Sequence, residues 1–128
     1  MQLEEFLAQV RERGEYRSRE ETEHVCEAVL WALATRIAPE EADELAARLP
    51  APLDEALHLE RGRPETFDCD EFLRRVSVQT GARPRTAEWD ADAVLSTVAD
   101  AVPDRQLEEL LSGLPARYAE FFGRSSPS

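Results

Sequence analysis

Residues 67–76 read Phe-Asp-Cys-Asp-Glu-Phe-Leu-Arg-Arg-Val, and residues 1–10 read Met-Gln-Leu-Glu-Glu-Phe-Leu-Ala-Gln-Val. Both stretches contain the tripeptide Glu-Phe-Leu, followed at the same distance by Val, and the two copies lie 66 residues apart. In each stretch the apolar side chains recur at the i, i+3, i+4, i+7 spacing of an amphipathic helix. The pattern therefore predicts a helical chain that contains one unit twice.

Two further motifs extend the repeat along the chain. Ala-Val-Leu occurs at 28–30 and again at 93–95, and Leu-Pro-Ala occurs at 49–51 and again at 114–116. Both pairs are 65 residues apart instead of 66. The second copy has therefore lost one residue between its first and second helices.

Each copy is predicted to form four helices. Apolar stripes mark the helices, prolines at 39, 50, 103 and 115 separate them, and no segment shows the two-residue alternation of a strand. We expect an all-α fold of eight helices, arranged as two tandem four-helix repeats with pseudo-two-fold symmetry. Because each copy is short, the copies should share one core in a single domain over 1–123. Its parts are repeat one (1–60), a linker (61–66) and repeat two (67–123), followed by a disordered tail (124–128).

Polar residues mark the starts of several helices. Asp68 is placed to cap the helix that contains Glu71, and Ser18 begins a capping-box sequence. Gln2 stands where the second copy has Asp68, so its helix should have a weaker cap. The second helix of the first copy carries an apolar stripe of Val25, Cys26, Val29, Leu30, Leu33 and Ile37.

Composition excludes several classes of partner. The 128 residues include 27 acidic and 15 basic residues, for a net charge of −12. Nucleic acid and anionic membranes are therefore not expected as partners, because both would be repelled. No stretch approaches the ~20 apolar residues of a membrane span, and the acidic start does not resemble a secretion signal. With two cysteines that we expect to stay reduced, the sequence favours a cytoplasmic location.

The repeated motifs also resemble a known family. The Glu-Phe-Leu openings, the Ala-Val-Leu centre of the long helix and the Leu-Pro step before an aromatic end are similar to the bacterial family called domain of unknown function 2267. The resemblance covers essentially the whole chain, and it implies a small, all-helical, soluble bacterial protein. It implies no reaction and no catalytic residues, because the shared motifs are packing motifs.

Two Glu-x-x-His tetrads suggest a metal-binding alternative. Glu21 precedes His24 by three residues, and Glu55 precedes His58 by three. Two such tetrads help to hold the di-iron centre of ferritin-like bundles, because positions three apart share a helical face. However, His24 is predicted to face solvent, opposite the apolar stripe, and neither tetrad recurs in the other copy. We therefore predict no metal or other cofactor, and we keep a metal-binding or redox bundle as the alternative.

Nucleophilic catalysis has little support in the sequence. Cys26 lies two residues after His24, but on a helix the two side chains point ~160° apart. Cys69 stands in the first turn of a helix, where the helix dipole lowers a thiol pKa, yet its stripe position predicts burial. No phosphate-binding loop and no nucleophile elbow is present. The sequence therefore predicts no catalytic residues and no enzyme.

Three residues are candidates for a partner surface. Trp31 projects from the back of the second helix, and its counterpart in the repeat is Ser96, so the shared fold does not require an aromatic there. Trp31 belongs either to a core that surrounds the helix or to a partner or dimer surface. Arg74 and Arg75 belong to three arginine pairs near the linker, the others being Arg61 with Arg63 and Arg83 with Arg85. These pairs either neutralise neighbouring carboxylates or form a patch for an acidic partner or a phosphate.

The predicted function is a small cytoplasmic interaction or scaffold module without catalytic activity, acting through helix faces on a protein partner or as a homodimer. A metal-binding bundle is one alternative. An apolar small-ligand carrier, with a cavity between the two copies, is the other.

Overall fold

The computed structural model describes residues 1–58, 64–82 and 84–123, and the described part is helical without strands. Its elements are α1 (Leu3–Gly14), α2 (Arg19–Arg36), α3 (Pro39–Ala46), the 3₁₀ helix η1 (Leu53–Leu57), α4 (Cys69–Thr80), α5 (Pro84–Ala101), α6 (Asp104–Ser112) and α7 (Tyr118–Phe121). The all-α prediction is confirmed. The predicted tail at 124–128 and linker residues 61–63 lie outside the described residues.

The number of α-helices differs from the prediction. The described residues form seven α-helices, because the fourth element of the first copy is a 3₁₀ helix. Its backbone N–H groups bond three residues back, as in Leu53 to Pro50 and His58 to Glu55. Only five residues lie between Pro52 and the end of this element. Short runs of i to i+3 bonds such as this one are the usual form of 3₁₀ helices in connections between longer helices.

Side-chain caps set the starts of two long helices. The Ser18 hydroxyl accepts a hydrogen bond from the backbone N–H of Glu21 at α2, and the Asp68 carboxylate accepts one from the N–H of Glu71 at α4. Gln2 makes no side-chain cap at α1. The sequence predicted all three of these starts correctly, because a cap depends on local chain geometry.

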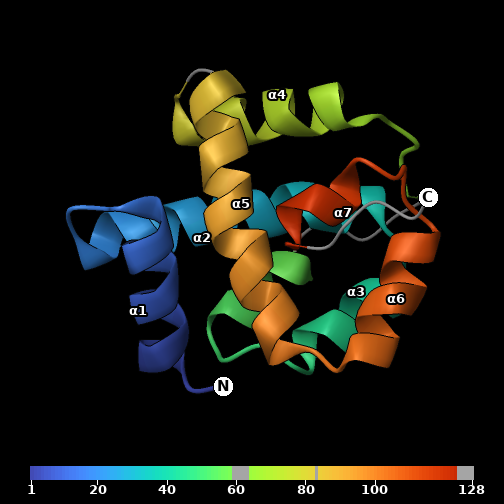
Figure 1. The fold of residues 1–128 in the computed structure, drawn as a ribbon, viewed down its shortest axis with the longest axis horizontal. Helices are drawn as coiled ribbons and strands as arrows, with labels where there is room; N and C mark the ends of the chain where they lie inside the picture. Colours follow the sequence, from blue (N-terminus) through green and yellow to red (C-terminus); the bar gives the residue numbers. More distant parts are fainter. Residues whose placement is uncertain (59–63, 83, 124–128) are drawn as a thin grey trace.

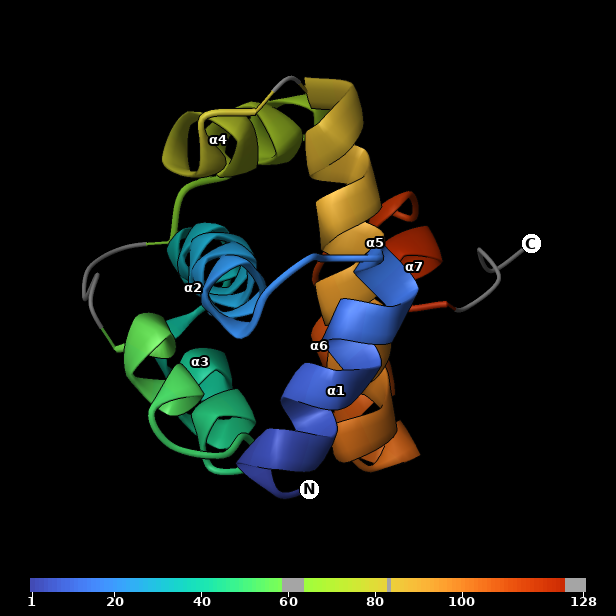
Figure 2. The same ribbon diagram turned by 90° about the vertical axis from the view of Figure 1, so that its left-hand side faces the viewer.

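Helix α2 lies at the centre of the molecule. Figure 2 shows it end-on, with α4 on one side, α3 on the opposite side, and α1 and α5 beside it. Ala28, Ala32 and Ala34 are buried together with the predicted apolar stripe. A helix that is apolar on most of its sides is expected to be buried on most of its sides. The small alanines let neighbouring helices come close to α2.

The two copies contribute to one continuous core. Fully buried side chains from both copies, including Phe6 on α1 and Phe72 on α4, belong to the same cluster. Burying each such side chain contributes roughly 1.5–3 kcal/mol. The second copy adds an aromatic group in which the rings of Phe72 and Tyr118 lie 5.4 Å apart and those of Tyr118 and Phe121 meet edge to face.

The first helix of each copy packs against the second helix of the other. Helix α1 packs against α5, and α4 packs against α2 (Figure 1). These two contacts position the grooves described below. Among the helices of the described residues, none combines the length and apolar character needed to span a membrane.

Candidate functional site

A groove between α2 and α4 brings together the three residues that the sequence singled out. Trp31 lies on α2, whereas Arg74, Arg75, Val78 and Gln79 lie on α4, and together they line a hollow of about 210 Å³. We call this hollow the α2–α4 groove. Helical periodicity explains the grouping on α4, because positions 74, 75, 78 and 79 are three to four residues apart and share one face.

The apolar part of the α2–α4 groove comes from Trp31 and Val78. Trp31 is partly buried and packs against the core. It therefore lies between the two predicted alternatives, a core residue and an exposed surface residue. Val78 is 64% exposed, more than any other large apolar residue in the described chain. Single exposed apolar residues are ordinary, but here the exposed Val lies in the same groove as a partly buried Trp.

Arg75 is held in place on several sides. Its guanidinium lies 4.1 Å from the centre of the Phe67 ring, and its Nη1 atom is 2.9 Å from Oε2 of Glu65. Its Nε atom donates to Glu71 at 2.8 Å. The Arg75 side chain is only 20% exposed. Stacking on an aromatic face and pairing with two carboxylates fix the orientation of this cation.

Arg74 shares the same acidic partner but remains open to solvent. It forms two parallel 2.7 Å hydrogen bonds to Glu71, from Nε and Nη2, while its side chain stays 61% exposed. Hydrogen bonds from Arg74 and Arg75 lower the pKa of Glu71 to about 2. Glu71 is therefore the anion that orders both arginines.

The arginine pairs therefore behave largely as ordinary neutralised charges. Arg74 and Arg75 do pair with neighbouring carboxylates, which was one of the two predicted outcomes. Arg61, Arg63 and Arg83 lie outside the described residues. The side chains that line the α2–α4 groove itself nevertheless include two cations and, among the described residues, no carboxylate.

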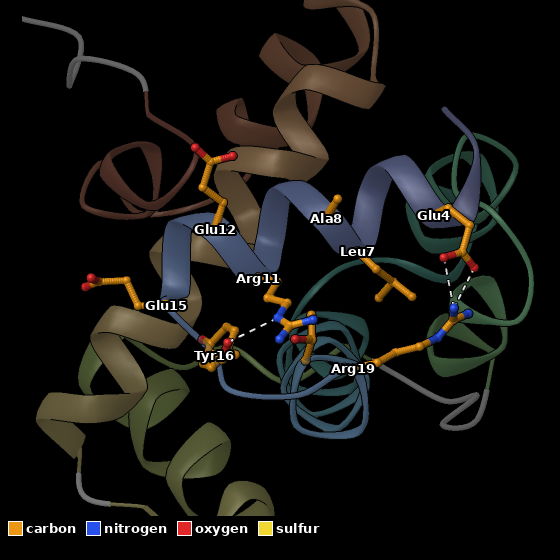
Figure 3. Close-up of a pocket in the computed structure, with 9 residues that line it drawn as sticks. Glu4, Leu7, Ala8, Arg11, Glu12, Glu15, Tyr16 and Arg19 are labelled. Atoms are coloured by element: carbon orange, nitrogen blue, oxygen red, sulfur yellow. Dashed lines mark hydrogen bonds and ion pairs between the residues drawn. The ribbon is translucent and has the colours of Figure 1, made fainter.

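A larger groove of about 610 Å³ runs between α1 and the start of α2. Figure 3 shows Arg11 of α1 and Arg19 of α2 between the two helices, whereas Glu12 and Glu15 point away from α2. Arg19 pairs with Glu4 at 2.7 Å, and Arg11 donates to the backbone carbonyls of Tyr16 and Arg17. These arginines thus hold the α1–α2 turn together, so we assign this groove a structural role.

Two further grooves carry acidic side chains. One, of about 200 Å³, lies between α3 and α6 and is lined by Glu41, Glu44 and Glu109 above buried leucines. The predicted apolar carrier requires a cavity between the copies, but carboxylates suit an apolar ligand poorly. The other, of about 330 Å³, lies beside α5 and α7 and includes Asp92 and Glu120.

The two Glu-x-x-His tetrads lie on different elements, α2 and η1, and make different contacts. His24 is exposed on the first turns of α2, as predicted, and Glu21 accepts a bond from the backbone N–H of Arg17. His58 follows η1 and lies 3.4 Å from Asp43 of α3, measured between Nδ1 and Oδ1. Within residues 1–58, 64–82 and 84–123, no three potential ligands gather into a group that could hold a metal ion.

Both cysteines are buried free thiols, as predicted. Burial raises the pKa of Cys26 to about 12 and that of Cys69 to about 11. Arg117 opposes the rise at Cys69 but is outweighed by desolvation. At neutral pH both groups are therefore protonated and unreactive.

Sequence reasoning missed two features. The first is the exposure of Val78, an apolar residue that lies off the apolar stripe of its helix. That position in the sequence could have indicated an exposed apolar side chain. The second feature is a buried pair in which the Tyr16 hydroxyl donates to the Asp90 carboxylate at 2.6 Å. These residues are 74 positions apart, and no local pattern connects them.

The comparisons with known proteins identify a family. The sequence matches the family described as Uncharacterized conserved protein (DUF2267) over residues 3–121. The match covers most of the 128 residues, so the chain belongs to this family. Among proteins with curated descriptions, none matches the sequence.

Proposed function

We propose that this member of the family is a non-catalytic interaction module of the cytoplasm that binds a protein partner at the α2–α4 groove. The observation that carries the proposal is the pairing of Trp31 with the 64% exposed Val78 in a groove lined by no described carboxylate. Apolar surface at a helix–helix groove is what a partner helix or loop covers when it binds.

The size of the groove favours a macromolecule over a metabolite. Pockets for small ligands and cofactors usually enclose about 300–1,000 Å³, whereas the α2–α4 groove measures about 210 Å³. A protein partner needs no enclosure, because it spreads its contacts over a wider surface around one or two anchoring side chains.

The state of the cysteines supports a non-catalytic, cytoplasmic protein. Cys26 and Cys69 are buried with raised pKa values, so neither provides the thiolate that nucleophilic catalysis or metal binding uses. Two unpaired thiols also suit a reducing compartment.

We also infer that the two copies are related by a pseudo-two-fold axis. Helices α1 and α4 are each 12 residues long, and α2 and α5 are each 18. Their bounds are displaced by 66 residues for the first pair and by 65 for the second, as the sequence repeat predicts. Superposing the first three helices of one copy on those of the other tests the inference, and a rotation far from two-fold would reject it.

Site-specific photo-crosslinking tests the proposed docking site. A photoreactive amino acid at Val78 should capture a partner protein in cells, whereas one at Glu108, exposed on α6, should not capture the same partner. The crosslink should disappear when Trp31→Ala is added. Native mass spectrometry of the purified chain separates a homodimer from a different partner. Equal capture at both positions, or capture that survives Trp31→Ala, would refute the proposal.

A further inference from the structure

We propose that the partner segment is an acidic amphipathic helix, whose apolar side chains cover Trp31 and Val78 while its carboxylates pair with Arg74 and Arg75. This inference rests on the proposed docking function and specifies the chemistry of the partner at the same groove.

The charge around the α2–α4 groove differs from that of the rest of the molecule. Acidic residues outnumber basic ones 27 to 15 in the chain. Three other grooves each present two or three carboxylates, and two of these grooves also include arginines. The lining of the α2–α4 groove differs in presenting two guanidinium groups and, among the described residues, no carboxylate. An acidic segment is repelled by most of this surface. Glu71 and Glu65 already pair with the two arginines, so the attraction of an acidic segment comes from direct contact with their remaining N–H donors and acts only at short range. Because these donors line the groove and no described carboxylate does, the lining favours an acidic partner over a basic one.

The two arginines are ordered before a partner arrives. Glu65, Glu71 and the Phe67 ring hold Arg75, and Glu71 holds Arg74. An arginine offers five N–H donors, and Arg74 uses two of them on Glu71. Further donors on a 61% exposed side chain remain available to a second carboxylate. Because the cations are already fixed, binding loses little side-chain entropy.

The shape of the site favours a helix over an extended strand. The groove is formed where α2 and α4 pack together (Figure 2), and the described residues offer no sheet edge to which a strand could add. Side chains of a third helix, spaced at i, i+3 and i+4, can enter the furrow between two packed helices. The same spacing places carboxylates on both sides of the apolar stripe, within reach of the arginines.

The other copy shows that the fold does not require this surface. In the sequence repeat, Gln79 matches Arg13 and Trp31 matches Ser96. Arg13 closes its own junction by hydrogen-bonding Ser96 at 3.1 Å. No such bond joins Trp31 and Gln79 among those found in the described chain. The α2–α4 groove instead has apolar side chains, Trp31 and the exposed Val78, in its lining.

A displayed peptide library tests the chemistry of the partner. The library consists of helices of about 16 residues, roughly four turns, with a fixed leucine stripe and with Glu, Gln or Lys randomised at every other position. The full chain selects binders at about 0.15 M salt. We expect Glu-rich binders, whose affinity falls about 10-fold or more with Val78→Ser. Val78 is exposed, so this substitution leaves the fold intact, which circular dichroism and thermal unfolding verify.

A charge-matched pair of variants tests the arginine contact. Arg74→Gln should weaken the selected acidic peptide about 2- to 5-fold, the effect of an exposed ion pair. Arg105→Gln changes the net charge equally on α6, where the side chain is 91% exposed, and should leave the affinity unchanged. Equal losses for the two variants would show a general charge effect and overturn the arginine assignment.

The remaining outcomes separate the two proposals. Binders that depend on Val78 but are rich in Gln or Lys overturn the acidic partner and leave the docking site intact. Binders that are indifferent to both Trp31→Ala and Val78→Ser overturn the docking site itself. A single-stranded oligonucleotide or inorganic phosphate that displaces the acidic peptide in an Arg74-dependent manner would show that the site recognises phosphate instead of a peptide carboxylate.

Discussion

The α1–α5 junction and the α2–α4 junction occupy matching places in the two copies, but polar bonds hold them differently. In the described chain the α1–α5 junction, called the closed junction below, has several short polar bonds between its helices, whereas the α2–α4 junction has one long bond, 3.5 Å from Nη1 of Arg75 to the hydroxyl of Thr35. At the α1–α5 junction, Arg13 donates to the hydroxyls of Ser96 and Thr97, at 3.1 and 3.0 Å, and pairs with Asp100 at 2.6 Å. At the other junction the residues matching Arg13 and Ser96 are Gln79 and Trp31. The comparison shows that two helix–helix contacts at matching sequence positions differ in the polar bonds that hold them.

The α1–α2 turn strengthens the closed junction further. Tyr16 reaches α5 through its bond to Asp90, and the indole N–H of Trp89 donates to the carbonyl of Gly14 at 2.9 Å. The residue matching Tyr16 in the second copy is Ala82, which has no side-chain donor. The described part of the α4–α5 turn therefore has no equivalent of the Tyr16 bond, although Arg36 of α2 donates to the carbonyl of Phe67, just before α4, at 3.0 Å.

The largest effect is expected from removing the Tyr16 hydroxyl. Tyr16→Phe removes the hydroxyl that donates to the Asp90 carboxylate, which is 2% exposed, so the free energy of unfolding should fall by about 1–3 kcal/mol. Tyr118→Phe is the matched control, because the bonds that its hydroxyl donates to the backbone carbonyls of Asp68 and Phe67 are long, at 3.3 and 3.4 Å. Urea denaturation measures both variants. Equal losses would mean that the Tyr16–Asp90 bond contributes nothing particular to the closed junction.

The cost of Tyr16→Phe should also depend on pH. Burial raises the pKa of Asp90, and the hydrogen bond from Tyr16 opposes that rise. A carboxyl with a raised folded-state pKa contributes stability below its unfolded pKa of about 3.9 and loses that contribution as the pH rises through the folded pKa. Because the variant raises this pKa further, its cost should be smallest near about pH 4 and grow toward pH 7. A cost that is constant across this range would contradict the argument.

Arg13 and Gln79 provide a direct comparison of the two junctions. Arg13→Ala removes three hydrogen bonds from a side chain that is 37% exposed, so we expect a loss of about 1 kcal/mol after allowing for solvent screening. Gln79→Ala should change the free energy of unfolding by less than about 0.5 kcal/mol, as for most surface positions. Thermal unfolding of the two variants checks the difference. A larger loss for Gln79→Ala would show that the α2–α4 junction is the more tightly held of the two.

The smallest effect is expected at Asp92, beside the closed junction. Although much of Asp92 remains exposed, partial burial together with Glu88 and Glu120 raises its pKa to about 6. Its carboxylate therefore destabilises the fold increasingly as the pH rises from about 4 to 6. Asp92→Asn should gain stability relative to the unaltered chain across that window, by less than about 1 kcal/mol at neutral pH because solvent screens the charge. Stability curves that stay parallel with pH would show that the carboxyl titrates normally.

The residues of the candidate site were predictable to different degrees. Trp31 was found from the sequence because its counterpart is a serine and it lies off the apolar stripe of its helix. Arg74 and Arg75 were named from the sequence as candidates for a partner surface or as charges paired with neighbouring carboxylates. The contacts of Arg75 with Phe67 and Glu65 could not be predicted, because they depend on how residues 65–67 lie against α4. Val78 gave a usable signal, as an apolar residue on the polar side of an amphipathic helix.

The sequence by itself determined the helical class, the matching bounds of the repeated helices, the caps at Ser18 and Asp68 and the stripes that became buried. Each of these depends on contacts within a few residues, which the order of side chains encodes directly. The tertiary structure alone decided that η1 is a 3₁₀ helix, that Tyr16 meets Asp90, and that Trp31 and Val78 share a groove with ordered arginines. Those outcomes depend on the relative placement of helices, which arises from the packing of the whole core.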